Sequence, residues 1–176
     1  MEELYVHFVT PVGPFLTWIE FATDYGSQNG LLIPPECYRE FLQHPERRIY
    51  ERMKSIAPQA RIFLHSCGSV RRLIPDLIEA GVEILNPVQT GARHMEPERL
   101  KREFGADITF WGGGCDTQKI LPLGTPAEVR EDVKRRMEIF MKGGGFVWAP
   151  IHNIMADIPP QNIEAAMEAA WEFGKY

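Results

Sequence analysis

Cysteine is scarce in this chain, since only three occur among its 176 residues, at Cys37, Cys67 and Cys115. An odd number of thiols cannot form a complete disulfide framework. In a reducing compartment such thiols serve as ligands, nucleophiles or core fillers. We expect Cys37 to be a filler, which leaves Cys67 and Cys115 as candidates for chemistry.

Basic runs and long hydrophobic runs are also absent. The 19 Lys and Arg residues are outnumbered by 24 Asp and Glu, so the formal net charge is −5 and no cationic stripe is available for a phosphate backbone. No segment is long enough to cross a bilayer, and the first five residues show no positive region before an apolar stretch. We therefore expect a cytoplasmic protein with no nucleic-acid or membrane partner, and a single domain over residues 1–176.

Phosphate-binding motifs are missing as well. The glycine runs at 112–114 and 143–145 fit neither the Walker pattern nor the dinucleotide pattern. We interpret both as tight turns.

A repeated strand-then-helix pattern is what the sequence does contain. Apolar runs typical of buried strands occur at 16–22, 62–64, 82–85, 108–111 and 146–149. The intervals between and after them show helical patterns, at 35–57, 69–80, 97–104, 125–142 and 160–173. Pro75 is expected to bend the second of these helices or to mark its true start. The last helix carries apolar residues at helical spacing that are expected to face the core, namely Ile163, Ala166, Met167, Ala170 and Trp171.

Nearly continuous apolar strands that alternate with helices predict an α/β fold with a parallel sheet covered by helices. An open doubly wound sheet would gather ligands at one switch point, whereas a β/α barrel gathers them at the carboxyl ends of all its strands. Polar candidates follow every predicted strand, which favours the barrel; they are Asp24, His65, Asn86, Gln89, Cys115 and His152. A closed TIM-type (β/α)8 barrel has eight units and about 250 residues. The five units here therefore predict an incomplete barrel, whose missing strands are absent from this chain or are supplied by another chain.

The segment His65-Ser66-Cys67 places an imidazole and a thiol two residues apart, where the predicted strand at 61–64 ends. Strand alternation puts His65 and Cys67 on the same side of the backbone. Nitrogen and sulfur donors suit Zn²⁺, which in catalytic sites has three protein ligands and one exchangeable position. The third ligand is expected to be His152, after the last strand, with Cys115 as the competitor.

Several segments together resemble the uroporphyrinogen decarboxylase superfamily, whose fold is a β/α barrel. They are 65–68 (HSCG), 85–89 (LNPVQ), 112–118 (GGGCDTQ) and 123–129 (LGTPAEV), and segment 21–30 (FATDYGSQNG) looks like the mid-barrel Asp-x-Gly-x-Gln segment of that family. The resemblance covers nearly the whole chain. It implies that these residues correspond to the C-terminal part of a longer barrel, about five units.

Within that superfamily the H-x-C element resembles the branch of zinc-dependent corrinoid methyltransferases. Those proteins carry a third ligand in an Ala-Pro-Gly-Cys segment, where this chain reads Ala149-Pro150-Ile151-His152. The resemblance implies a Zn²⁺ held by His65, Cys67 and His152, or with Cys115 as a fourth ligand. It also implies methyl transfer between a small methyl donor or acceptor and a corrinoid protein, through a zinc-activated thiol in one direction.

Three further residues, Asp24, Asn86 and Gln89, are predicted to orient the substrate or the metal ligands from around the site. They would then be the catalytic residues beside the metal. Their alternative role is that of turn or capping residues at strand ends.

Two other functions remain open on the sequence. One is metal-free decarboxylation of a porphyrinogen-like substrate, which needs cationic clamps that only Arg71 and Arg93 could provide here. The decarboxylases' essential aspartate and arginines belong to N-terminal segments without a counterpart in these residues. The other is a half-barrel that is inactive alone and assembles with itself or with a complementary chain.

Overall fold

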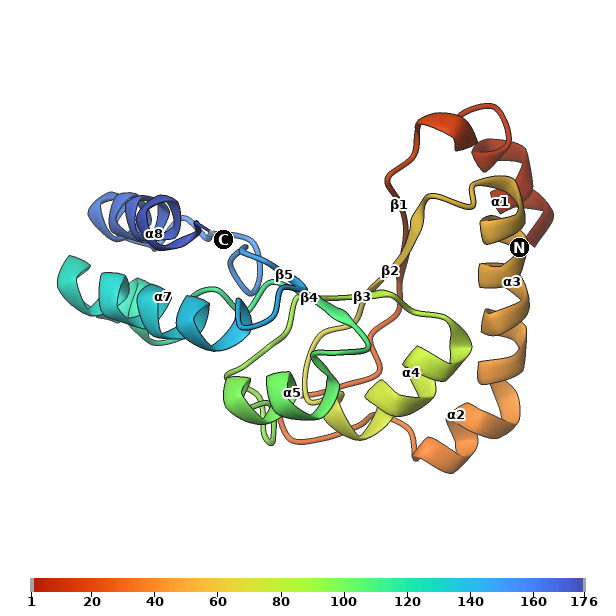
Figure 1. The fold of residues 1–176 in the computed structure, drawn as a ribbon. Coiled ribbons are helices and arrows are strands. Elements are labelled where there is room, and N and C mark those ends of the chain that lie inside the picture. The colour runs from red at the N-terminus through yellow and green to blue at the C-terminus, as the bar shows by residue number, and fades with distance from the viewer. Residues whose placement is uncertain (1, 176) are drawn as a thin grey trace.

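Five parallel strands form a single curved sheet in the computed structural model, which describes residues 2–175 (Figure 1). The strands are β1 (Trp18–Ala22), β2 (Arg61–His65), β3 (Ile84–Asn86), β4 (Thr109–Trp111) and β5 (Phe146–Val147). Their order in the sheet is their order in the chain, β1-β2-β3-β4-β5. The α/β prediction and the five predicted strands are confirmed, and the arrangement is that of a partial TIM barrel.

Eight α-helices accompany the strands in the described part of the chain. They are α1 (Glu2–Val9), α2 (Pro35–Phe41), α3 (Gln43–Ile56), α4 (Ile74–Ala80), α5 (Pro97–Phe104), α6 (Ile120–Leu123), α7 (Pro126–Phe140) and α8 (Pro160–Phe173), with 3-10 turns η1 (Gly13–Phe15) and η2 (Arg71–Leu73). The predicted bounds of α5 and α8 are confirmed. Sequence patterns did not predict α1 or the short α6.

Proline explains two boundaries that the sequence prediction missed or left open. The predicted helix at 35–57 is two helices, because Pro45 lacks an N–H and its ring clashes with the carbonyl four residues earlier, at Phe41, where α2 ends. The predicted helix at 69–80 begins only at Ile74, so Pro75 lies in its first turn and marks its true start.

The helices cover one face of the sheet. Leu64, Leu85 and Phe110 lie in register across β2, β3 and β4, and all three are fully buried beneath the helices. Figure 1 shows an arc of helices on the outside of the curved sheet, from α1 and α3 through α4 and α5 to α7 and α8. This is the helix layer of a β/α barrel.

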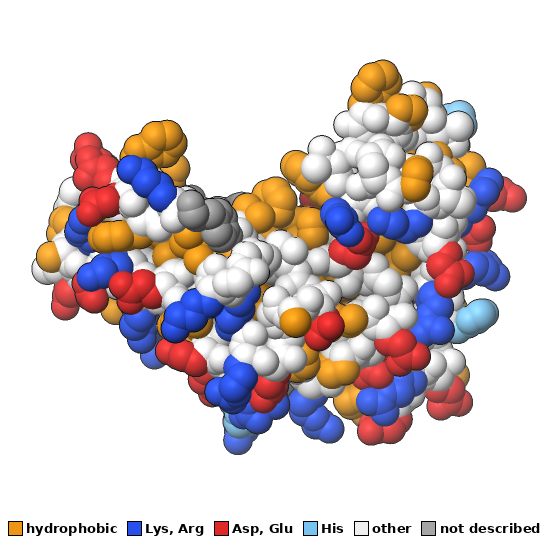
Figure 2. All heavy atoms as spheres, in the orientation of Figure 1, with side chains coloured by type: hydrophobic (Ala, Val, Ile, Leu, Met, Phe, Trp, Pro, Cys, Tyr) orange, Lys and Arg blue, Asp and Glu red, His pale blue; other side chains and the backbone are white. Residues whose placement is uncertain are grey.

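The inner face of the sheet carries an aromatic cluster instead. The ring of Trp111 lies 5.2 Å from that of Trp18 and 5.4 Å from that of Phe63, measured between centroids. Trp18 is 41% exposed, whereas a closed barrel fills its interior with side chains from all its strands. Figure 2 shows the molecule hollowed between two lobes, with hydrophobic side chains at the bottom of the hollow.

Within residues 2–175 the sheet does not close, because β1 pairs only with β2 and β5 pairs only with β4. The open edge affects α8. Ala166 and Ala169 are buried against the rest of the chain, but Met167 is 54% and Trp171 is 83% exposed. The prediction that Met167 and Trp171 face the core is therefore wrong for this chain, since α8 packs on α7 and α6, and its apolar face is wider than these two helices cover.

None of the helices described is long and apolar enough to cross a membrane.

Candidate metal centre

Three candidate ligand residues meet at the carboxyl end of the first two strands. Asp24 lies two residues after β1, His65 ends β2, and Cys67 follows two residues later. Each offers one ligand atom, and these atoms all lie within 4.8 Å of one another. Asp24 is exposed, whereas His65 and Cys67 are half-buried. The structure thus brings together the predicted His65 and Cys67 and adds the carboxylate of Asp24, which the sequence had assigned only an orienting role.

Backbone packing between two loops positions these residues. The amide of Ser69 donates to the carbonyl oxygen of Ser27 at 2.8 Å. Gly68 has a φ of +84°, and a Cβ atom there would lie 2.5 Å from the backbone carbon of Gly26. Only a residue without a side chain allows this approach. The loop at 66–69 therefore rests directly on the backbone of the loop at 24–27.

Asn86 fixes which nitrogen of the neutral His65 ring carries the hydrogen. It pairs with His65 in the register of β2 and β3, and its Oδ1 lies 2.6 Å from His65 Nδ1. Its Nδ2 donates to the carbonyl oxygen of Trp111 at 3.0 Å, so the amide cannot turn over without losing that bond. Oδ1 therefore accepts from Nδ1–H, and the lone pair of His65 is left on Nε2. Nε2 is the atom that faces Cys67 Sγ, at 3.4 Å.

Asp24 and Gln89 bind the backbone of the loop at 66–69, called the thiol loop because it carries Cys67. The amide of Cys67 donates to Asp24 Oδ1 at 2.8 Å, and the amide of Gly68 donates to Gln89 Oε1 at 2.8 Å. Burial raises the pKa of the Cys67 thiol, and the nearby charge of Asp24 and a hydrogen bond to it raise the pKa further. The free thiol is thus kept protonated, and a cation is the partner that would favour its thiolate.

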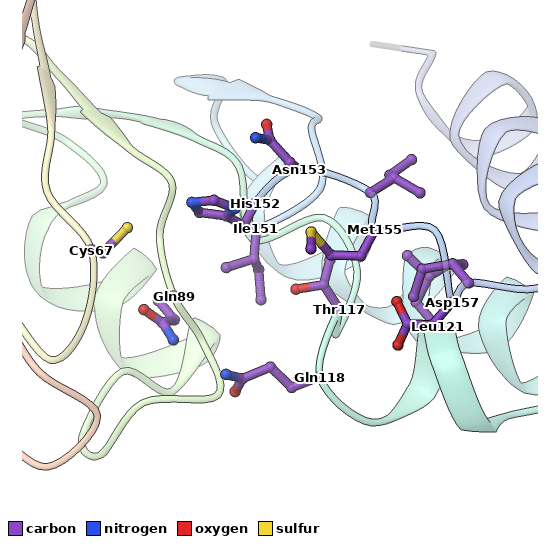
Figure 3. Close-up of a pocket in the computed structure, with 12 residues that line it drawn as sticks. Cys67, Gln89, Thr117, Gln118, Leu121, Ile151, His152, Asn153, Met155 and Asp157 are labelled. Carbon is purple, nitrogen blue, oxygen red and sulfur yellow. The ribbon is translucent and has the colours of Figure 1, made fainter.

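His152 approaches this cluster from the opposite side of the rim. Its ring centroid lies 6.4 Å from that of His65, and the side chain is exposed. Figure 3 shows its imidazole and the sulfur of Cys67 pointing toward each other. His152 therefore stands beside the three clustered residues without belonging to their 4.8 Å group.

Cys115, the competing candidate, lies elsewhere. It is fully buried, and burial together with the charge of Asp132 raises the pKa of its thiol to about 12. The structure leaves Cys115 outside the cluster of Asp24, His65 and Cys67.

A cavity of about 270 Å³ opens beside Cys67 and His152 (Figure 3). Its polar wall includes Gln89, Thr117 and Gln118, with Asp157 further along. Its apolar wall is formed by Leu121, Ile151, Ile154, Met155 and Ile158. Neither Arg71 nor Arg93 lines this cavity, and Arg71 is paired with Glu103 at 2.8 and 3.1 Å. The cationic clamps expected for a porphyrinogen are therefore not at this site among the described residues.

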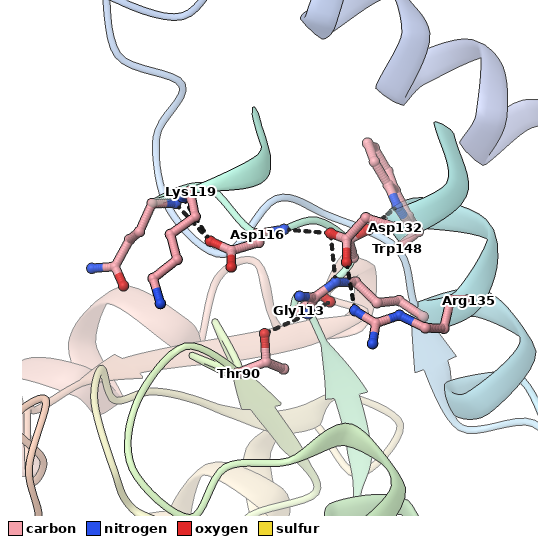
Figure 4. A network of polar contacts seen from close by, with 10 residues as sticks. Thr90, Gly113, Asp116, Lys119, Asp132, Arg135 and Trp148 are labelled. Atoms are coloured by element: carbon pink, nitrogen blue, oxygen red, sulfur yellow. Dashed lines mark hydrogen bonds and ion pairs between the residues drawn. The ribbon is translucent and has the colours of Figure 1, made fainter. Parts of the chain in front are cut away.

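A buried ion pair that the sequence analysis did not identify supports the far wall of the cavity (Figure 4). Asp132 accepts from Arg136 Nε at 2.8 Å and from the amide of Asp116 at 2.9 Å. Arg136 also donates to Thr90 Oγ1 at 2.5 Å and to the carbonyl oxygen of Gly113 at 3.1 Å. The i,i+4 spacing of the pair on α7 was the only available sequence signal.

The fold of this chain resembles that of a known protein, and its sequence matches a known protein family. The chain is similar in structure to a methyltransferase from Methanosarcina mazei, with a TM-score of 0.69 and 22% sequence identity over 99% of this chain. The match covers 48% of that protein, so the chain spans about half its length. No curated protein matches the sequence. The family described as uroporphyrinogen decarboxylase (URO-D) matches residues 21–173, which span every strand but the start of β1, and the chain belongs to that family.

Proposed function

We propose that this chain is a zinc-dependent methyltransferase subunit, which moves a methyl group between a small substrate or thiol and a corrinoid protein. The observation that carries the proposal is the convergence of Asp24, His65 and Cys67 at the carboxyl end of the sheet. The similarity of the fold to a methyltransferase agrees with it.

The donor set fits zinc. Zn²⁺ takes thiolate, imidazole and carboxylate ligands, and all three types are present within 4.8 Å. His152 stands close enough to the group to join it by a movement of its exposed side chain. When bound, zinc supplies Lewis acidity that lowers the pKa of a coordinated thiol, so that the thiolate is available as a nucleophile at neutral pH.

The residues of the chain have separate tasks in this scheme. His65 presents Nε2 because Asn86 holds the proton on Nδ1. Cys67 must lose its proton before it can act as a ligand, and its backbone is kept in place by Asp24 and Gln89 through the loop at 67–68. Metal uptake should therefore release protons.

The adjoining cavity limits the size of the substrate. At about 270 Å³ it lies just below the usual range for ligand pockets, roughly 300–1,000 Å³. Gln89 and Gln118 can hydrogen-bond a polar group, and Leu121 and Ile158 provide an apolar surface. A small methylated compound or thiol fits this space.

A second proposal concerns the active unit. The half-length match, the two open sheet edges and the 83% exposed Trp171 favour an assembly in which further barrel strands cover the inner face. The chain alone would then be an incomplete enzyme, and the complement would be a second copy or a chain that carries the other strands.

Zinc analysis of the purified chain tests the main proposal. We expect about one equivalent of zinc in the parent and less than about a tenth of an equivalent in His65→Ala and Cys67→Ala, because each removes a ligand. Cys37→Ala is the matched control, since Cys37 is a free thiol far from the site in sequence, and it should retain the metal. A parent chain that binds no zinc, or a Cys67→Ala variant that binds as much as the parent, would refute the proposal.

The transfer step can be measured separately with methylcobalamin as the corrinoid and 2-mercaptoethanol as the thiol. The zinc-loaded chain should accelerate the spectral change that accompanies demethylation of the corrinoid, and Cys67→Ala should not. If the chain binds zinc but is inactive alone, adding the complementary half of a related barrel should restore activity.

A further inference from the structure

A second concavity lies on the other side of the thiol loop. It encloses about 280 Å³ and is lined by Asn29, Gly30, Leu31, Ser69, Arg71, Arg72, Arg93 and His94. It shares no lining residue with the cavity beside Cys67. The two sites are therefore separate, although Ser69 is only two residues from Cys67.

The lining of this concavity carries three arginine charges, of which only that of Arg71 is paired with a carboxylate, Glu103, among residues 2–175. Three arginines and one histidine face it, and no Asp or Glu does. The cavity beside α3 differs, since Arg47 and Lys54 are balanced there by Glu51, Glu79 and Glu83. A chain with a net charge of −5 thus places two unpaired arginines, Arg72 and Arg93, at one concavity. Figure 2 shows Lys and Arg side chains gathered with a histidine at the lower edge of the molecule, near α5.

The arginines differ in how they are held. Arg71 is fixed by Glu103 through a two-pronged ion pair at 2.8 and 3.1 Å, and Glu103 is shared with Arg99. Arg72 and Arg93 are exposed, and no ion pair involves either of them within residues 2–175. Their guanidinium groups are therefore available to a ligand.

The backbone around the concavity is built as one unit. Ser69 Oγ donates to the carbonyl oxygen of Arg93 at 2.5 Å, and the amide of Arg93 donates to the carbonyl oxygen of Gln28 at 2.9 Å. These bonds join the loops that follow β1, β2 and β3. The arginines thus project from connected segments, which reduces the ordering that binding requires.

We propose that this concavity binds a phosphate-bearing small molecule. Planar guanidinium groups match phosphate oxygens in two-pronged, charge-assisted hydrogen bonds, and several of them around one cavity favour a dianion over a monoanion. The volume accommodates a phosphate group with a small body attached. The position next to the loop of Cys67 makes the ligand a neighbour of the candidate metal centre without contact with its ligands.

Calorimetric titration with inorganic pyrophosphate tests the proposal on the 176-residue chain. We expect saturable one-to-one binding. The affinity should fall about tenfold or more in Arg93→Gln and in Arg72→Gln, because each variant loses one charge-assisted contact. Arg52→Gln is the matched control, because Arg52 is an exposed arginine of α3 outside this concavity, and its variant should bind as the parent does. Thermal unfolding and zinc content, measured on each variant, separate loss of the anion site from loss of the fold or of the metal centre.

Three results would overturn the proposal. The first is the absence of a saturable pyrophosphate signal with the folded parent. The second is an Arg52→Gln variant that weakens binding as much as Arg93→Gln, which would indicate general attraction to positive charge. An oligoglutamate peptide that displaces pyrophosphate and binds more tightly would point to an acidic protein partner instead.

Discussion

The amide of Asn86 determines which nitrogen of His65 can bind a metal. Its Nδ2 donates to the carbonyl oxygen of Trp111, and its Oδ1 accepts a hydrogen bond from Nδ1–H of His65. The imidazole is thereby prepared for coordination before any metal arrives, which lowers the cost of binding.

Replacement of this amide should weaken zinc binding without removing a ligand. For Asn86→Ala we expect a fall in zinc affinity of about 10- to 100-fold, because the tautomer and the ring orientation are no longer fixed. Competition with a chromophoric chelator measures the affinity. Asn29→Ala, at an exposed asparagine outside the metal centre, serves as the control. Equal affinities in both variants would show that the Asn86 contact has no role in coordination.

At this scale the sequence predicted part of the site. Strand alternation placed His65 and Cys67 together, because they are two residues apart at the end of a strand. It did not predict that Asp24 would join them, since that depends on the packing of one loop on another at Gly26 and Gly68. Cys115 was the competitor of His152 for the third ligand position in sequence, but it is buried next to Asp132, and burial cannot be read from its position after a strand.

At the scale of elements, the loops that follow the strands hold Asp24 and Cys67 beside His65 at the end of β2. The loop at 66–69 lies on the loop at 24–27, and the side chain of Gln89 accepts from the amide of Gly68. A change in the conformation of one loop should therefore shift the positions of the others.

Gly68→Ala tests this packing. The new Cβ would fall 2.5 Å from the backbone carbon of Gly26, and the φ of +84° is unfavourable for alanine. We expect a loss of more than about 1 kcal/mol in the free energy of unfolding, measured by urea denaturation, together with weaker zinc binding. Gly30→Ala is the control, since a Cβ there meets nothing within 4 Å. Parent-like stability and zinc affinity in Gly68→Ala would contradict the packing described here.

The ion pair of Asp132 and Arg136 links α7 to the loops after β3 and β4. Burial alone would raise the pKa of Asp132, but the charge and hydrogen bond of Arg136, with further hydrogen bonds from the Asp116 amide and Arg135, outweigh it. The pKa of the carboxyl is therefore lowered in the native state. An unfolded aspartate has a pKa of about 3.9. The stabilisation is therefore complete above that pH and is lost as the pH falls through the lower native pKa.

Asp132→Asn should leave Arg136 buried without its counter-charge. We expect a loss of about 3–5 kcal/mol in the free energy of unfolding at neutral pH, as for other broken buried pairs. The difference from the parent should shrink in acid, where the parent also loses the ionised carboxyl. Asp107→Asn, at an exposed aspartate, should change stability little at either pH. A difference that stays constant from neutral to acid pH would argue against an ionised Asp132.

Sequence patterns predicted elements better than their ends. Every strand overlaps its predicted run, because a strand buried on one side and helical spacing both leave clear signals. The break at Leu42 depended on a single proline whose ring conflicts with a carbonyl in the previous turn. The apolar periodicity of α8 identifies its hydrophobic face, which includes Met167 and Trp171. It does not say whether a neighbouring element covers that face.

The molecule as a whole is an arc with two free edges. In the part of the chain that the structure describes, the first strand and the last strand each lack a second neighbour, and the inner aromatic face is partly exposed. Exposed edges and apolar faces of this kind promote association. The count of five predicted units already indicated an incomplete barrel. Only the packing of α8 in the structure shows which part of the helix layer is left exposed.

Removal of the exposed indole should reduce that association. In analytical ultracentrifugation we expect the parent to gain mass with concentration and Trp171→Gln to remain smaller, because the largest exposed apolar side chain of α8 is gone. The free energy of unfolding should change by less than about 0.5 kcal/mol, as for other surface substitutions. Leu123→Gln is the matched control, since Leu123 of α6 is 82% exposed and Trp171 is 83% exposed. A parent that stays monomeric at every concentration would remove the basis for an assembly through this edge.

Strand β5 is only two residues long, and the segment that carries His152 follows it. Besides β5, this segment is anchored by the amide of Gly114, which donates to the carbonyl oxygen of Ala149 at 3.0 Å, and by the indole nitrogen of Trp148, which donates to the carbonyl oxygen of Gly114. Ile151 and Ile158 are buried. Such a short ladder opens at little cost. A cation held jointly by His65 and His152 would then cross-link the segment after β5 to the end of β2. Backbone amides near His152 would therefore exchange with solvent more slowly in the metal-loaded protein than in the metal-free one.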